Sequence, residues 1–211
     1  MPRKTAASRH EIDEGQRTEL IDVLIAFHHP TRRWLHEILA LEGPASVGGL
    51  AGRTGLAVGS VSHHLKPLHR QGFIEPAPEL ARDTRESWWR VVPRRLSWST
   101  DDFALDTPGR LVADRAASEN FRHQVRAVQQ WLARADDAPS EWRQAASSTD
   151  TTTRATAAQL RDLSVRVQEL VDVWTAECDA ANDADRAQPS ADGRRPVRFV
   201  ARAFPTEAVH P

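Results

Sequence analysis

A pair of short helices separated by a glycine, within residues 46–72, constrains this chain more than any other feature. Gly55 can adopt the left-handed conformation that ends a helix, so a first helix is predicted over residues 47–54, with Ser46 as its N-cap. A second helix is predicted over residues 57–70. Three of its apolar residues share one face: Val61, Leu65 and Leu68. Because helices this short are unstable alone, that face has to pack against the first helix, as in a helix-turn-helix.

Two segments rich in β-forming residues follow the second helix. Residues 73–77 and 86–92 are predicted strands, and the polar stretch from Arg82 to Arg85 turns between them. The order helix, glycine turn, helix, strand, polar loop, strand is that of a winged helix-turn-helix, in which the strands form a wing beside the second helix.

Two further helices are predicted upstream. The first begins at Thr18 and stops before Pro30, and the second begins near Pro30 and ends at Gly43. Helical periodicity predicts their buried faces, which are Leu20, Val23, Leu24 and Phe27 on the first and Trp34, Leu35, Ile38, Leu39 and Leu41 on the second.

Beyond residue 95 the pattern is mainly helical. Thr107 and Pro108 have the cap and first-position signature of a long helix, and another helix is expected over about residues 154–180. A linker over residues 180–195 and a strand over residues 196–204 are expected to follow. Each long helix carries an apolar stripe: Phe121, Val125, Val128 and Leu132 on the first, and Leu160, Leu163, Val167, Leu170 and Trp174, at heptad spacing, on the second.

The predicted fold class is therefore α+β and mainly helical: a winged helix-turn-helix with a helical C-terminal extension that ends in a short strand. Three segments are expected. Residues 1–15 form a polar, disordered tail, residues 16–95 form the winged helix-turn-helix domain, and residues 96–211 form a mainly helical dimerisation or effector region.

Composition excludes several classes of protein. No apolar run approaches the roughly 18 residues of a membrane span, and the N-terminus lacks the apolar core of a signal peptide, so a cytoplasmic protein without a membrane partner is expected. The single cysteine, Cys178, cannot form an intramolecular disulfide or a Cys-rich zinc site. The chain has no glycine-rich phosphate loop, nucleophile elbow or carboxylate cluster beside a histidine, so no enzyme, catalytic residue or cofactor is predicted.

Charge is distributed unevenly along the chain. The net charge is −1, but residues 46–95 hold eight basic and four acidic side chains. Such a local surplus is expected where one face meets the phosphates of a nucleic acid. The helix over residues 57–70 fits this interpretation, because its N-terminal end carries residues short enough to enter a major groove: Val58, Gly59, Ser60, Ser62 and His63. Since Val61 and Leu65 fix its inward side, His63 is expected to point outward and His64 to pack locally.

Several spaced motifs agree with one family pattern. They are, in order, His29-Pro30-Thr31-Arg32-Arg33, Leu50-Ala51, Gly55-Leu56, Val61-Ser62-His63-His64-Leu65-Lys66, Leu68 and Gly72-Phe73-Ile74. Over residues 18–95 the sequence resembles the arsenic-repressor (ArsR) family of bacterial transcriptional regulators. The resemblance implies a homodimer that binds double-stranded DNA at a twofold-symmetric operator, usually as a repressor. It places base contacts at Ser62 and His63, beside Gly59 and Ser60, and wing contacts at Arg82 and Arg85. Lys66 completes the expected DNA-binding set.

Two features depart from that family's pattern. The founding members bind metal through paired cysteines, whereas residues 45–52 contain none. Pro67 removes a hydrogen bond inside the second helix and is expected to kink or end it.

Two alternatives stay open. One is a winged helix used for protein–protein contact without DNA binding. The other is a metal-sensing repressor that uses histidines and carboxylates, among them Asp114 and His123. No specific metal site is predicted, and the sequence does not identify an effector.

Overall fold

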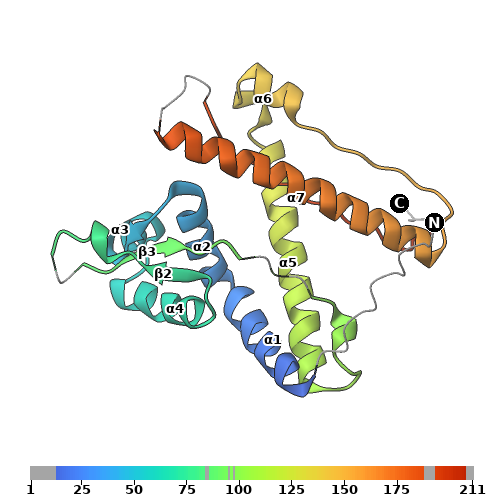
Figure 1. Ribbon diagram of the computed structural model, residues 1–211, viewed down its shortest axis with the longest axis horizontal. Coiled ribbons are helices and arrows are strands. Elements are labelled where there is room, and N and C mark those ends of the chain that lie inside the picture. Colours follow the sequence, from blue (N-terminus) through green and yellow to red (C-terminus); the bar gives the residue numbers. More distant parts are fainter. Residues whose placement is uncertain (1–12, 84–85, 95, 97, 188–192, 208–211) are drawn as a thin grey trace, which may run out of the picture. The chain divides into compact units, whose positions relative to one another are not determined.

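The computed structural model describes residues 13–83, 86–94, 96, 98–187 and 193–207. The chain divides into two compact units, residues 1–133 and 134–211. The helices of the first unit are α1 (Glu14–Phe27), α2 (Pro30–Glu42), α3 (Val47–Thr54), α4 (Val58–Arg70) and α5 (Pro108–Leu132), and its strands are β1 (Ala45–Ser46), β2 (Ile74–Pro76) and β3 (Trp88–Val91). The 3-10 turns η1 (Pro78–Leu80) and η2 (Thr100–Asp102) complete it, and Figure 1 labels the principal elements. The second unit contains η3 (Ala135–Asp137), α6 (Ser140–Ala145) and α7 (Ala157–Ala187).

The predicted helix-turn-helix is confirmed, including its caps. The Ser46 hydroxyl accepts a hydrogen bond from the Gly49 backbone N–H at 3.0 Å and so caps α3. Gly55 follows with φ of 70°, in the left-handed region that a glycine adopts without strain. Of the two outcomes expected at Pro67, the end of the helix is wrong, because α4 runs past this proline to Arg70. Pro67 lies in the last turn of α4, where it removes one backbone hydrogen bond and only three helical residues follow it.

The first helix begins earlier than predicted. Asp13 accepts a hydrogen bond from the Gln16 backbone N–H, and the Gln16 side chain accepts one from the Asp13 N–H. This reciprocal capping box starts α1 at Glu14, four residues before the predicted Thr18. The disordered tail is expected over residues 1–15. Residues 1–12 lie outside the described residues, and residues 13–15 are instead the cap and the start of α1.

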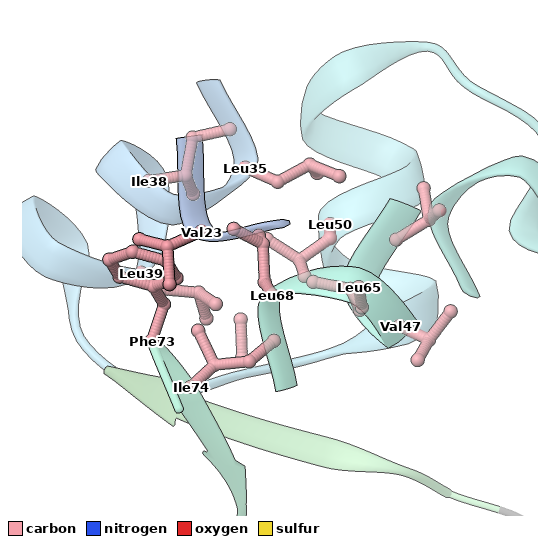
Figure 2. Close-up of a cluster of buried hydrophobic side chains, with 12 residues drawn as sticks. Val23, Leu35, Ile38, Leu39, Val47, Leu50, Leu65, Leu68, Phe73 and Ile74 are labelled. Carbon is pink, nitrogen blue, oxygen red and sulfur yellow. The ribbon is translucent and has the colours of Figure 1, made fainter. Parts of the chain in front are cut away.

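The core of the winged helix is a cluster of aliphatic side chains around Phe73. Figure 2 shows Leu65 and Leu68 of α4 facing side chains from α1, α2 and α3. The predicted inward face of α4 is confirmed, since Val61, Leu65 and Leu68 are fully buried. On α2 the prediction is partly wrong: Leu35, Ile38 and Leu39 are buried, but Trp34 and Leu41 are 44% and 53% exposed. Both lie at the margins of the apolar arc, which the small core beneath α2 does not reach.

A small antiparallel sheet joins the helix-turn-helix to the wing. Strand β3 lies in the middle, paired with β1 on one edge and β2 on the other. The register sets Ala45 opposite Trp89 and Ile74 opposite Val91. Strand β1, just upstream of α3, therefore fixes the position of β3, the second strand of the wing.

A second apolar cluster fastens α5 to α1. It contains Leu24, Phe103, Ala113 and Ala116, all buried, with Leu96 and Trp98 packed against it. The predicted Thr107 cap is confirmed, because its hydroxyl accepts a hydrogen bond from the Arg110 N–H at 3.2 Å. Farther along α5 the predicted apolar stripe lies exposed: Phe121, Val125, Val128 and Leu132.

The second unit differs from the prediction at its C-terminal end. Helix α7 continues to Ala187, through the first half of the expected linker, because its Ala-rich sequence favours helix. The predicted terminal strand over residues 196–204 is wrong: this segment is in neither helix nor strand. A strand requires a hydrogen-bonded neighbour, and a β-forming sequence alone does not supply one.

Candidate nucleic-acid interface

The outward side of α4 carries the residues that were expected to read DNA. Gly59, His63 and Lys66 are exposed, and Val58, at the first turn, is 56% exposed. Ser60 and Ser62 are half-buried. The buried opposite face fixes the orientation of the helix, so these residues lie on its accessible side.

The two adjacent histidines of α4 point in different directions, as predicted. His63 is exposed, whereas His64 is half-buried and packs against the ring of His29, with ring centroids 4.9 Å apart. Only His63 is therefore free to approach a base edge.

An open hollow of about 320 Å³ lies between the N-terminal ends of α3 and α4 and the root of the wing. Two of the residues that line it are joined directly, because the Val47 N–H donates a hydrogen bond to the Ser87 carbonyl at 3.0 Å. Its walls come from three segments: Ser46, Val47 and Gly48, then Val58 and Ser62, then Glu86 and Ser87. The hollow brings Ser62 and the wing root to one surface.

The wing is stabilised at its root by a carboxylate. One oxygen of Glu86 accepts hydrogen bonds from the Trp88 indole N–H at 3.0 Å and from the Arg82 backbone N–H at 3.1 Å. The bond from Trp88, followed by that from Arg82, lowers the pKa of Glu86 and keeps it ionised. The Arg82 side chain is exposed, as its predicted role requires, while Arg85 lies outside the described residues.

Sequence reasoning did not find the contacts that the start of α2 makes with α1 and α4. The Arg32 guanidinium donates hydrogen bonds to the carbonyls of Ala26 at 2.7 Å and Ile25 at 2.6 Å, so a cation closes the end of α1. Burial is the first cause of a lowered pKa at both His29 and His64, and neighbouring cations add to it. His29 and His64 are distant in sequence, so no local pattern signals their contact.

Polar contacts also join α2 to α5. His123 Nε2 lies 2.6 Å from a carboxylate oxygen of Glu37, and the Arg33 guanidinium donates to the Asn120 side chain at 2.8 Å. Asp114, the other residue considered for a metal, instead accepts a hydrogen bond from Arg110 at 3.0 Å. The structure thus does not bring Asp114 and His123 together, and the described part of the chain contains no group of three or more His, Cys, Asp or Glu able to hold a metal ion.

Comparison with known proteins assigns this region to a family. The family profile described as "Bacterial regulatory protein, arsR family" matches residues 29–75, from the start of α2 to β2. Residues 29–75 are an ArsR-family domain. The match covers α2, α3 and α4, and so includes every expected DNA-binding residue of the ArsR-family domain except those of the wing. A comparison with curated proteins finds no match.

Several solved structures are similar to this chain, at low sequence identity and low TM-score. NolR from Sinorhizobium fredii is 23% identical, with 37% of this chain and 74% of that chain covered and a TM-score of 0.32. Reduced HlyU from Vibrio cholerae N16961 is 18% identical, with coverages of 53% and 93% and a TM-score of 0.32. An ArsR-like transcriptional regulator from Rhodococcus sp. RHA1 is 21% identical, with coverages of 60% and 98% and the same TM-score. The assignment of the ArsR-family domain rests on the sequence match.

Among the described residues, no helix is long and apolar enough to cross a membrane.

Proposed function

We propose that this chain is a sequence-specific DNA-binding transcriptional regulator whose helix α4 enters the major groove. The observation that carries the proposal is that α4, within an ArsR-family domain, has one buried face and one accessible face. Its inner residues Val61, Leu65 and Leu68 are fully buried, and its N-terminal outer end carries short or polar residues that are exposed or half-buried. A bulky or acidic end would not fit a groove lined by base edges and phosphates.

Each expected contact has a chemical role. Ser62 and His63 pair with base edges, and Val58 contacts a thymine methyl group. Gly59 and Ser60 let the backbone approach, while Lys66 binds phosphate. The wing residues Arg82 and Arg85 bind the phosphate backbone or the minor groove.

The regulator is proposed to act as a homodimer and a repressor at a twofold-symmetric operator. One winged helix covers a single half-site, so two copies are needed to read about two turns of DNA. The stripe of Phe121, Val125, Val128 and Leu132 on α5 is exposed in the single chain, and apolar surface of this kind is commonly covered by a partner. A twofold interface covers it in both copies at once.

Selection of duplexes from a random DNA pool tests the central proposal. The wild type should enrich a palindromic site and bind it far more tightly than a shuffled duplex. Ser62→Ala combined with His63→Ala should weaken binding to that site by about 1–3 kcal/mol for each base that the variant no longer reads, and should change binding to shuffled DNA much less. Equal weakening on both duplexes would mean that these residues do not read bases. If no site is enriched, the DNA-binding function is wrong and the winged helix is a protein-binding module.

The wing and the dimer have separate tests. Arg82→Ala with Arg85→Ala should lower the slope of log affinity against log salt by about one for each phosphate that the variant no longer binds. Val125→Glu with Leu132→Glu should give a monomer in sedimentation and weak operator binding. A wild type that sediments as a monomer at micromolar concentration yet binds its operator tightly would contradict the dimer.

A further inference from the structure

A group of basic side chains from three helices lies beside the outward end of α4. We call it the histidine ledge; it consists of His29 and Arg32 at the start of α2, His63 and His64 on α4, and Arg115 on α5. The rings of His29 and His64 lie 4.9 Å apart between centroids, and those of His63 and His64 lie 5.4 Å apart. The ring contacts therefore run from the exposed His63 through His64 to His29.

The ledge has an excess of positive charge. After burial, the groups among the described residues that act on the pKa of His29 are all basic, namely Arg32, His64, Arg115 and His63, and none of the causes raises it. For His64 the contributing groups are His63 and Arg32. Arg32 cannot move away, because the carbonyls at the end of α1 hold its guanidinium. Arg115 is exposed, and the described part of the chain shows no ion pair for it.

The histidine rings are placed to accept a ligand from outside. Nδ1 of His29 and Nδ1 of His64 are each enclosed without a hydrogen-bond partner. Nε2 is therefore the nitrogen that remains available on each ring. A neutral imidazole that keeps its proton on Nδ1 can take a second proton at Nε2. An anion beside Nε2 favours that protonated form, in which the Nε2–H donates to the anion.

We propose that the histidine ledge binds a phosphate of the DNA backbone beside the groove that α4 enters, and that binding draws a proton onto the ledge. This inference rests on the proposed function and adds a second contact region outside the helix-turn-helix and the wing. DNA is the anion that fits, because the ledge begins at His63 on the reading helix and a duplex that contacts His63 presents its phosphates to the neighbouring rings.

The sign of the pH effect follows from linkage. In the free protein His29 and His64 stay neutral to a pH below their usual 6.5, since burial and the surrounding cations oppose protonation and lower the pKa of each ring. A bound phosphate reverses that balance, so the complex holds more protons than the separate molecules. Affinity for DNA should then rise as the pH falls from 7.5 to 5.5, by at most about tenfold per pH unit for each proton taken up.

The test uses the full-length chain and the duplex enriched by the wild type. Affinity is measured between pH 5.5 and 7.5 at constant salt, and between 50 and 200 mM salt at pH 6, with circular dichroism at each pH to verify folding. His29→Gln removes a ring at the centre of the ledge, and Arg115→Gln removes an exposed charge without disturbing the core. Arg126→Gln is the matched control, because it removes an exposed arginine from the same helix three turns away. His63→Gln, measured alongside, separates the contribution of the outward histidine.

The pH dependence of DNA affinity should persist in His63→Gln and flatten in His29→Gln. Arg115→Gln should lower the slope of log affinity against log salt by about one relative to Arg126→Gln. Specific binding by the wild type, with a pH slope unchanged in His29→Gln and equal salt slopes in the two arginine variants, would overturn the ledge and leave the proposed function standing. Absence of any enriched duplex would overturn both.

Discussion

His28 gives the most direct quantitative prediction from this structure. It ends α1 with only 8% of its surface exposed, edge-on to Phe27 and Trp98 at ring-centroid distances of 5.4 and 5.7 Å. Neither ring nitrogen has a hydrogen-bond partner among the described residues. Burial first, and then the charges of Arg33 and His123, lower its pKa to about 4. The folded protein therefore holds this ring neutral where the unfolded chain would protonate it.

The consequence is a loss of stability on the acid side. Because the folded pKa lies below the unfolded value of 6.5, the stabilising effect is complete above pH 6.5 and declines as the pH falls toward 4. At pH 5 the free energy of unfolding should be about 2 kcal/mol lower, through this group, than it is well above pH 6.5. His28→Leu removes the titration and replaces two unsatisfied nitrogens with a side chain of similar bulk, so it should be neutral or stabilising at pH 7.5.

Hydrogen exchange of peptides from α1 and α2, measured through a urea series, reports the stability of the first unit by itself. Between pH 7.5 and pH 5 the wild type should lose about 2 kcal/mol more than His28→Leu. Parallel losses in the two proteins would show that His28 is protonated in the folded state and would refute the reasoning.

Two further predictions concern packing. A Cβ at Gly109 would lie 2.9 Å from a ring carbon of the buried Phe103, whereas one at Gly52 would meet nothing within 4 Å. Gly109→Ala should therefore destabilise the first unit by about 1–3 kcal/mol, and Gly52→Ala should stabilise it by about 0.5–1 kcal/mol, in the same exchange experiment; shifts of the same sign would contradict this. Leu65→Ala, at a fully buried position of α4, should lower the free energy of unfolding by about 2–5 kcal/mol in urea denaturation, and a decrease below about 1 kcal/mol would mean that the core collapses around the gap.

The helix-turn-helix was predictable because its determinants are local. Ser46 and Gly55 specify where α3 begins and ends, and the spacing of Val61, Leu65 and Leu68 specifies which side of α4 is buried. That same spacing predicted the outward direction of His63. The reading end of the candidate site was therefore within reach of sequence analysis.

The parts that were missed depend on neighbours distant in the chain. Trp34 extends the apolar arc of α2, but whether it is buried depends on how much core lies beneath it. The segment around Phe199 has the composition of a strand, and no strand of the described chain pairs with it. The ring contact between His29 and His64 needs α2 and α4 to meet, which neither segment encodes alone. Tertiary contacts of this kind override local preference.

The middle position of β3 has a consequence for how such a chain can diversify. Since β1 holds one edge of β3 and β2 holds the other, the segment between β2 and β3 is anchored at both ends. Lengthening a surface loop with fixed ends changes the closure entropy by only about 0.6 kcal/mol per doubling of its length. Insertions or deletions between Ala77 and Ser87 would thus alter the reach of the wing along DNA while α4 keeps its place. The length of the wing and the base contacts of α4 can then vary independently over evolution, because the short sheet separates the two.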